Sequence, residues 1–248
     1  MQDKESTKKS GSWLEVFKTF FWALVIAMVF KSFLFQPFNI PSGSMKPTLL
    51  IGDYLIVSKY SYGYSKHSFP FSPNIFDGRK LYKEPKRGDI VVFYVPQQKA
   101  DKDTYIKRLI GLPGDEIQVT KGILYINGEM VKQENDGMFY DQDMHHDIKR
   151  LFETLPEGKK HWILDDSVSE MGNFYGLDPN NTPIYKVPEG YFFMMGDNRD
   201  NSADSRFPSL GFVAAENLIG RAEIILFASG ESWNPLKWQY KRFFTLLR

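Results

Sequence analysis

The 248-residue sequence contains no cysteine at all. This absence excludes disulfide bonds, zinc sites built from thiolates and a cysteine nucleophile. Net charge is nearly absent as well, because 31 basic residues balance 30 acidic ones and leave a formal charge of +1 at pH 7. A chain without excess positive charge gives no reason to expect nucleic acid as a partner.

The familiar catalytic and metal-binding motifs are missing too. The four histidines form no H-E-x-x-H pattern and no serine stands in G-x-S-x-G, which excludes by motif a zinc metalloprotease and an α/β-hydrolase. The simplest interpretation of His145 and His146 is a solvated pair on a polar loop. The acidic stretch after Gly196 fails the spacing of a calcium-binding EF-hand, because Ser202 stands where that loop needs glycine. We therefore expect no metal and no cofactor.

A long uncharged hydrophobic run is also lacking, although the N-terminal region comes close to one. The strictly uncharged stretch, Thr19–Phe30, is only 12 residues long, whereas a membrane-spanning helix needs about 20. Lysines near both ends can extend their amines to the lipid headgroups, so a span of roughly 20 residues near Leu14–Phe35 fits a bilayer. A cleavable signal peptide would need a small-x-small site next, which is absent. A core helix would carry a polar face, whereas apolar residues cover every face here.

We therefore expect a single uncleaved membrane anchor over residues 13–36, preceded by a short cytoplasmic tail, residues 1–12. Three lysines of that tail, Lys4, Lys8 and Lys9, precede the apolar run. Positive charge keeps the adjoining segment on the cytoplasmic side of a membrane. The rest of the chain would then lie outside the cytoplasm.

Beyond the anchor, the sequence predicts strands and no long helix. Short apolar or alternating runs bounded by Gly, Pro or Asp are typical of strands. They occur at Asp53–Lys59, Asp89–Val95, Tyr105–Gly111, Tyr191–Gly196 and Leu218–Phe227.

A hairpin and an insertion complete the expected fold. Asn127-Gly128, between Ile123–Ile126 and Glu129–Lys132, is a strong hairpin signal because the pair suits a type I′ turn. The region from Gln133 to Pro188 is polar and rich in glycine and proline, so we expect a loop-rich insertion there. The predicted fold class is mainly β, with an N-terminal transmembrane helix, an antiparallel sheet domain and a smaller inserted β-rich subdomain.

The first segment that could carry chemistry is Phe38–Leu49, directly after the anchor. It contains Ser42-Gly43-Ser44, and prolines fix the chain on both sides of this tripeptide. A tight turn can expose one hydroxyl and aim hydrogen-bond donors at a single point, as a nucleophile with an oxyanion hole requires. Ser-Gly-Ser is also common in plain linkers, so a linker is the alternative here.

The second segment is Tyr105–Asp115, where a lysine stands among apolar residues. On a strand, Tyr105, Lys107 and Leu109 share one face. Burial lowers the pKa of a lysine, and the neutral amine can then act as a general base. The alternative is a lysine on an exposed edge strand that prevents aggregation.

The third segment is Gly196–Arg206, a dense polar cluster that follows an apolar strand. Its charged members are Asp197, Arg199, Asp200, Asp204 and Arg206. Such density is more than a solvated loop needs. It indicates that ion pairs and hydrogen bonds fix side-chain positions there.

These three segments, together with Gly52–Val57 and Lys86–Phe93, resemble the conserved boxes of the bacterial type I signal peptidase family. That family uses a serine–lysine dyad. The resemblance covers most of the chain, and the polar insertion corresponds to the family's variable second domain. It implies a catalytic domain made of residues 37–116 and 188–248, interrupted by a second domain over residues 117–187.

The resemblance also implies residue roles. Ser44 matches the nucleophile and Lys107 the general base, while Ser42 would form the oxyanion hole with the Ser44 N–H. Ser202 matches the serine that orients the lysine amine, and Lys46 occupies a position that varies in the family. The supporting ion-pair residues would be Arg108, Asp197, Asp204 and Arg206. The residues lining the small substrate pockets would be Phe38, Ile40, Pro41, Met45, Tyr105 and Ile106.

The activity implied is that of a serine endopeptidase in the bacterial inner membrane, with its N-terminus in the cytoplasm and its catalytic domain on the periplasmic face. It would remove signal peptides from secreted preproteins by cutting after small residues at positions −1 and −3. The lipid bilayer would be its other partner, with no metal, cofactor or nucleic acid.

Two other functions fit parts of the pattern. A membrane-tethered, non-catalytic β domain that binds peptides would not need a neutral Lys107. A self-cleaving serine–lysine repressor would need a DNA-binding helix-turn-helix where this chain has its apolar segment.

The aromatic stretch Phe69–Phe76, with Trp233 and Trp238, is suited either to the membrane interface or to core packing.

Overall fold

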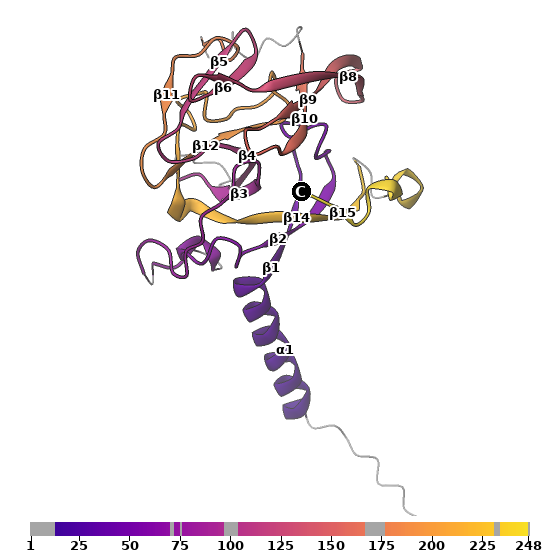
Figure 1. Cartoon of the computed structure of the whole chain (residues 1–248). Helices are drawn as coiled ribbons and strands as arrows, with labels where there is room; N and C mark the ends of the chain where they lie inside the picture. Colours follow the sequence, from indigo (N-terminus) through magenta and orange to yellow (C-terminus); the bar gives the residue numbers. More distant parts are fainter. Residues whose placement is uncertain are drawn as a thin grey trace, which may run out of the picture.

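A computed structural model describes residues 13–69, 72–74, 76–96, 104–166, 177–230 and 234–247 of the chain. It places one α-helix ahead of a body of strands (Figure 1). The strands form one eight-stranded sheet and two smaller sheets of three and four strands. The predicted fold class, mainly β with an N-terminal helix, is confirmed.

The helix α1 (Trp13–Phe33) is 21 residues long and stands apart from the strands. Its most apolar stretch is not buried within the protein at all, and Figure 1 shows the helix projecting away from the body. Within the described residues it is the one helix long and apolar enough to cross a membrane. Other elements would cover a core helix, so that alternative is wrong.

The helix stops before residue 36 because the chain enters a sheet. β1 (Phe35–Asn39) pairs antiparallel with β2 (Asp53–Ser58) from its first residue. β1 contains Pro37, which cannot donate a backbone hydrogen bond and is tolerated because β1 is an edge strand. The helix therefore leads straight into the sheet, with only Leu34 between the two elements.

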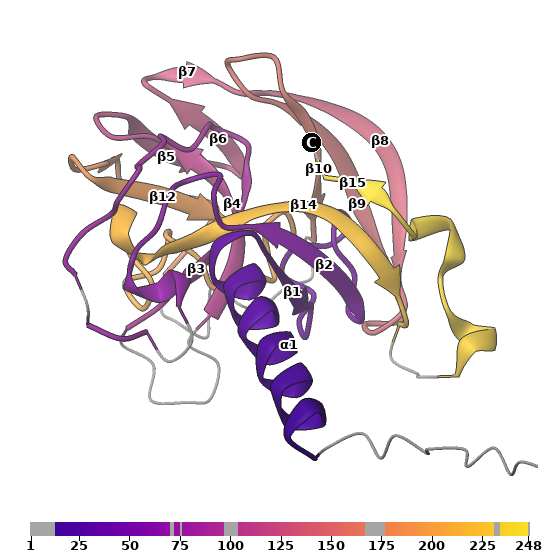
Figure 2. The ribbon, with the colours of Figure 1, turned by 90° about the horizontal axis from the view of Figure 1, so that it is seen from below.

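The main sheet has the strand order β1-β2-β14-β3-β4-β12-β13, with β15 added on β14, and all its pairs are antiparallel. Figure 2 shows β14 running between β2 and β3. The five strands predicted from apolar runs all form, with bounds that agree within one residue. Besides β1 and β2, the members are β3 (Ile90–Tyr94), β4 (Thr104–Gly111), β12 (Tyr191–Met195), β13 (Val213–Ala214), β14 (Leu218–Ala228) and β15 (Thr245–Leu246).

Strand β4 lies where three apolar clusters meet. Its Ile106 packs on a cluster with β2 and β14 residues, Leu109 belongs to a second cluster, and Ile110 belongs to a third. Burial of apolar side chains contributes about 25 cal/mol per Å2 of area removed from water. A strand anchored on several sides in this way gives Lys107 a fixed backbone.

The two smaller sheets contain residues between 116 and 186. Four strands form the sheet β11-β5-β6-β7 and three form the sheet β10-β9-β8. Figure 1 places them at the end of the molecule away from α1. Their bounds are β5 (Glu116–Thr120), β6 (Ile123–Ile126), β7 (Glu129–Met130), β8 (Lys132–Asp141), β9 (His146–Thr154), β10 (Lys160–Asp165) and β11 (Tyr185–Lys186).

The expectation of a loop-rich stretch after Gln133 is wrong for β8, β9 and β10. These strands read as loops because one face is polar, and the ion pair Arg150–Asp136 joins β9 to β8 on that face. The hairpin prediction is confirmed, because Asn127 and Gly128 have φ values of 53° and 80° as a type I′ turn requires. The predicted domain boundaries at residues 116 and 187 stay a prediction.

Short 3₁₀ turns and aromatic contacts complete the fold. Pro70, Phe71, Ile75 and Trp233 of the aromatic segments lie outside the described residues. Phe69 packs edge-on against Phe33 at the end of α1, with 5.4 Å between ring centroids. Trp238 packs against Phe227 and Phe243, so internal packing accounts for it. The 3₁₀ turns are η1 (Lys66–Ser68), η2 (Ala215–Asn217), η3 (Pro235–Lys237) and η4 (Tyr240–Arg242).

Removing residues 1–31 is expected to leave the strand body folded, because α1 is exposed along its length. Ser32 and Phe33 are kept because Ser32 is buried and the Phe33 carbonyl accepts from Tyr64. The thermal transition of the truncated chain should match that of the full chain within a few degrees, measured by circular dichroism in the same detergent. A chain that fails to fold would show that α1 is part of the core.

Candidate active site

Ser44 lies in the turn between β1 and β2, and its side chain is nearly covered. Ser44 is 9% exposed, whereas Ser42 is exposed to solvent. Backbone bonds close the loop at its base, because Ile40 N donates to Asp53 O and Gly52 N donates to Ile40 O, each at 2.9 Å. The turn is therefore held at its base by β-type pairing.

Lys107 reaches Ser44 from strand β4. Its Nζ lies 2.6 Å from Ser44 Oγ, a hydrogen-bond distance, although 63 residues separate the two in sequence. Lys107 is 3% exposed and β4 lies between β3 and β12 in the sheet. The alternative of an exposed edge-strand lysine is wrong.

Burial lowers the pKa of Lys107 from 10.5 to about 8, because the ammonium loses its hydration. The carboxylates of Asp204 and Asp197 oppose this effect, and the guanidinium of Arg206 adds slightly to it. The amine also lies 5.6 Å from the ring centroid of Tyr105, on the same face of β4. A neutral amine is therefore accessible near physiological pH.

Asn198 holds the serine turn from the other side. Its backbone N–H donates to Ser44 O and its Nδ2 donates to Gly43 O, each at 3.1 Å. Thr48 adds a third link, because its Oγ1 donates to Asp197 Oδ2 at 2.6 Å. Asn198 was not predicted to have a role of its own, since a contact between residues so far apart in sequence has no local signal.

Ser202 is 1% exposed, and its Oγ has no hydrogen-bond partner within the described residues. A buried hydroxyl without a hydrogen-bond partner destabilises the fold, so its presence suggests a functional role. Gly196 is packed directly between Ser202 and Ser44. A Cβ added to Gly196 would lie 2.2 Å from Ser202 Oγ and 2.5 Å from Ser44 O, so this position requires glycine. No local sequence pattern marks this requirement.

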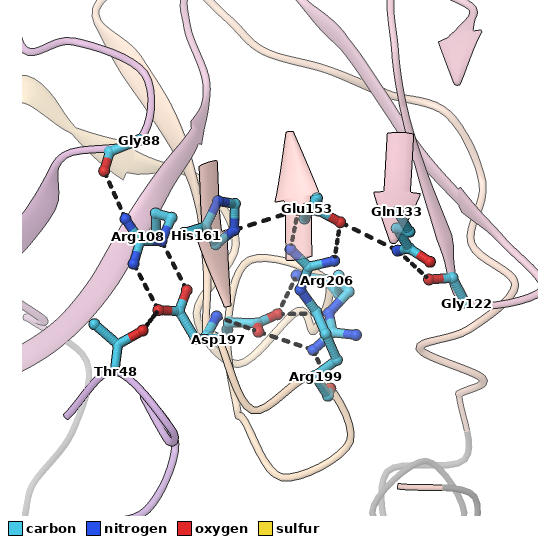
Figure 3. Close-up of polar contacts among 12 residues, drawn as sticks. Thr48, Gly88, Arg108, Gly122, Gln133, Glu153, His161, Asp197, Arg199 and Arg206 are labelled. Atoms are coloured by element: carbon cyan, nitrogen blue, oxygen red, sulfur yellow. Dashed lines mark hydrogen bonds and ion pairs between the residues drawn. The ribbon is translucent and has the colours of Figure 1, made fainter. Parts of the chain in front are cut away.

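The polar cluster after Gly196 is an ion-pair network, as expected (Figure 3). Arg108 donates to both carboxylate oxygens of Asp197, at 2.8 and 2.6 Å, and to Gly88 O at 2.8 Å. Arg206 likewise binds both oxygens of Asp204, each at 2.9 Å. Asp204 also accepts from Gly196 N. All four predicted ion-pair residues thus pair with one another.

Two members of the network were not predicted. Glu153 of β9 is completely buried and binds the guanidinium of Arg199, with Nη1 at 2.7 Å from Oε2. His161 of β10 is buried beside it, with Nε2 at 3.4 Å from Glu153 Oε1. His161 lies within β10, and His146 is the first residue of β9, so the expectation that His145 and His146 form a pair on a polar loop is wrong for His146. Burial and the nearby Arg108 lower the pKa of His161.

The residues predicted to line substrate pockets differ in exposure. Phe38, Ile40, Met45 and Ile106 share one apolar cluster, in which Ile40 and Met45 are almost fully buried. Tyr105 packs on a different cluster, and Pro41 is exposed. The structure thus brings four of the six together in one cluster, which includes Met45, the residue after Ser44.

The described residues contain no group of three His, Asp or Glu side chains that could hold a metal ion. The assembled groups are a hydroxyl, an amine with a lowered pKa, and backbone donors on a glycine-containing turn. Such a set suits nucleophilic attack on an acyl carbon by an activated serine.

Comparison with known proteins identifies the family of this chain. The family model for signal peptidase, peptidase S26, matches residues 13–227. Signal peptidase I of Rickettsia typhi is 40% identical over 238 residues, which cover 93% of this chain and 86% of that protein. Signal peptidase I of Rickettsia prowazekii is 41% identical over 223 residues, which cover 88% and 81%.

Signal peptidase I of Enterococcus faecalis, known from a crystal structure, is 28% identical and covers 56% of this chain and 97% of its own, with a TM-score of 0.33. The family match runs from α1 through the serine turn and β4 into β14. The chain therefore belongs to the bacterial type I signal peptidase family.

Proposed function

We propose that this serine-type endopeptidase removes signal peptides from exported preproteins with Ser44 as nucleophile and Lys107 as general base. The observation that carries the proposal is the 2.6 Å contact between Lys107 Nζ and Ser44 Oγ in a buried site. Family membership supports the reaction. A non-catalytic peptide-binding domain would not need this contact.

The reaction follows from the positions of the two groups. Neutral Lys107 accepts the Ser44 proton as Oγ attacks the carbonyl carbon after the −1 residue. The C–N bond then breaks, and the proton on Lys107 passes to the leaving amine. Water, deprotonated by the same amine, releases the signal peptide from the acyl-enzyme. The Ser44 N–H and the Ser42 hydroxyl stabilise the oxyanion in both steps.

The cleavage-site peptide docks as an extended strand along Tyr105–Lys107. β12 ends at Met195 opposite Arg108, so this part of β4 continues past the β12 pairing. The half-buried Phe38 and Ile106 line shallow apolar pockets that accept small side chains at positions −1 and −3. The buried Ile40 and Met45 pack behind them, and Pro41 lies at the rim.

The polar network keeps the base in place. Ser202, buried and without a described hydrogen-bond partner, orients the Lys107 amine. The pairs Arg108–Asp197 and Arg206–Asp204 fix the loop that carries Ser202. They also neutralise the carboxylates that would otherwise hold Lys107 in its charged form.

The helix α1 anchors the enzyme as a single span in the inner membrane, with its N-terminus in the cytoplasm and the strand body on the periplasmic face. The length of α1 and the exposure of its most apolar stretch support the span, and the lysines of the N-terminal tail support the orientation. Confinement of enzyme and preprotein to one membrane face raises their effective concentration.

Replacing Ser44 by Ala or Lys107 by Met is expected to reduce cleavage to background. Since the two side chains act as one unit, the double variant should be no worse than either single variant. Cleavage of a preprotein by the detergent-solubilised enzyme, with the product identified by mass spectrometry, measures this. Lys132→Met, an exposed lysine on β8, serves as the control and should keep full activity. Near-wild-type cleavage by Lys107→Met would rule out the dyad.

Activity should rise with pH through a midpoint near 8, because only the neutral Lys107 amine can accept the Ser44 proton. A histidine base would place the midpoint near its usual pKa of about 6.5. Replacing His67, His145 and His146 together by Gln should leave the profile in place, and His161→Gln is tested separately because that ring is buried. The measurement is kcat/KM from pH 6 to 10, and a midpoint that moves in the triple variant would point to a histidine base.

Lys107→Met should be more stable than the natural enzyme at pH 7. The folded-state pKa lies below the unfolded value, so below pH 8 the folded state carries the full cost of a buried ammonium. That cost falls as pH rises from 8 to 10.5, because the unfolded chain then binds more protons. A shift from 10.5 to about 8 corresponds to roughly 3 kcal/mol as an upper figure.

Urea unfolding at pH 7 and at pH 10.5 measures the difference, with Ser44→Ala as the variant that changes no charge. The advantage of Lys107→Met should shrink at the higher pH. Equal stability of Lys107→Met and the natural enzyme at pH 7 would contradict a buried amine with a lowered pKa.

A further inference from the structure

Lys46, two residues after Ser44, is buried and bound to two carboxylates. Its Nζ lies 2.6 and 2.8 Å from the two carboxylate oxygens of Asp141 and also donates to Asp143 Oδ2. Lys46 is 5% exposed and Asp141 is fully buried. Burial of a lysine is costly unless its charge is paired and hydrogen-bonded, as it is here.

The Lys46 side chain lies against the serine turn on its way to these carboxylates. A Cβ added to Gly43 would lie 3.0 Å from Lys46 Cε and 3.2 Å from Lys46 Cδ. The backbone N–H of Lys46 also donates to Gly43 O at 3.1 Å. Lys46 therefore contacts the residue that separates Ser42 from Ser44.

The carboxylates belong to the turn between β8 and β9, in the three-stranded sheet. Asp141 ends β8, and its Oδ1 accepts from the backbone N–H groups of Asp143 and Met144, at 2.9 and 3.3 Å. The acceptor of Lys46 is thus fixed by its own hairpin. The ion pair joins two segments that are 95 residues apart in sequence.

The contacts on Lys46 leave it no role as a base. An ammonium has three N–H donors, and three carboxylate oxygens lie within reach of them. The charges that shift the pKa of Lys107 are Asp204, Asp197 and Arg206, and Lys46 is not among them. Its effect on the reaction must therefore be positional.

We propose that Lys46 is a positioning residue that fastens the Ser42–Ser44 turn to the β8–β9 hairpin through Asp141 and Asp143. Asn198 holds the same turn from the loop after Gly196. Fixed from two sides, the turn keeps Ser44 Oγ within hydrogen-bond reach of Lys107. The proposal rests on the proposed function and gives the three-stranded sheet a part in catalysis.

The test compares Lys46→Met, Asp141→Asn and the double variant Lys46→Met/Asp141→Asn. Methionine retains the packing on Gly43, and asparagine retains an oxygen acceptor for the hairpin turn. The double variant leaves no unpaired charge at the buried position and so protects folding. Lys149→Met is the matched control, because it removes a more exposed ion pair within the same sheet.

In the proposal, kcat falls about 10-fold to 100-fold in all three variants, since a displacement near 1 Å can have that effect. KM changes little, because the substrate strand is unaffected. The double variant loses no more than the larger single loss, since both changes break one link. The midpoint of the pH profile stays near 8, and Lys149→Met keeps the natural kcat.

A kcat in the double variant within about twofold of the natural value overturns the proposal, and so does an equal loss in Lys149→Met. A shifted pH midpoint would show that Lys46 acts on Lys107 and would also overturn it. If Lys46→Met fails to fold, Asp143→Asn, whose side chain is 30% exposed, carries the same test. An active Ser44→Ala would instead refute the proposed function itself.

Discussion

The contact between the Lys107 amine and the Ser44 hydroxyl depends on keeping water away from an amine. An ammonium in a dry site is costly, and that cost brings the neutral form into the working range of pH. The central position of β4, with an apolar cluster at each of Ile106, Leu109 and Ile110, supplies the dry site. The same packing that builds the core therefore lowers the pKa of Lys107.

Apolar packing around the Lys107 amine is not sufficient, because the serine turn and the loop after Gly196 must also be fixed in place. Ion pairs and hydrogen bonds do this. The protein meets this need with carboxylates that are already neutralised by arginines. Asp197 and Asp204 each bind a guanidinium through both oxygens. The two carboxylates still raise the pKa of Lys107, but burial lowers it by more. The network thus fixes the serine turn and the loop after Gly196 without returning the pKa of Lys107 to its usual value.

Much of this arrangement was predictable from the sequence, although several features were not. The strands of the main sheet were marked by apolar runs, and the burial of Lys107 by its apolar neighbours on β4. Three kinds of feature were missed. The strands β8 to β10 were obscured by their polar faces. Gly196 is required by a Cβ clash that only the folded structure contains. Lys46, Asn198 and Glu153 act through partners far away in sequence, so no local pattern identifies them.

With α1 spanning the bilayer as proposed, the direct passage from α1 into β1 limits the distance between the lipid and the serine turn. Only Leu34 separates the helix from a five-residue strand, and the serine turn follows that strand. At about 3.3 Å per residue, the strand raises the turn by at most roughly 17 Å. In the proposed arrangement, with α1 in the bilayer, a preprotein held in the same membrane needs only about five extended residues between its apolar segment and the scissile bond. The short junction would then make spacing along the preprotein a selection criterion alongside side-chain size.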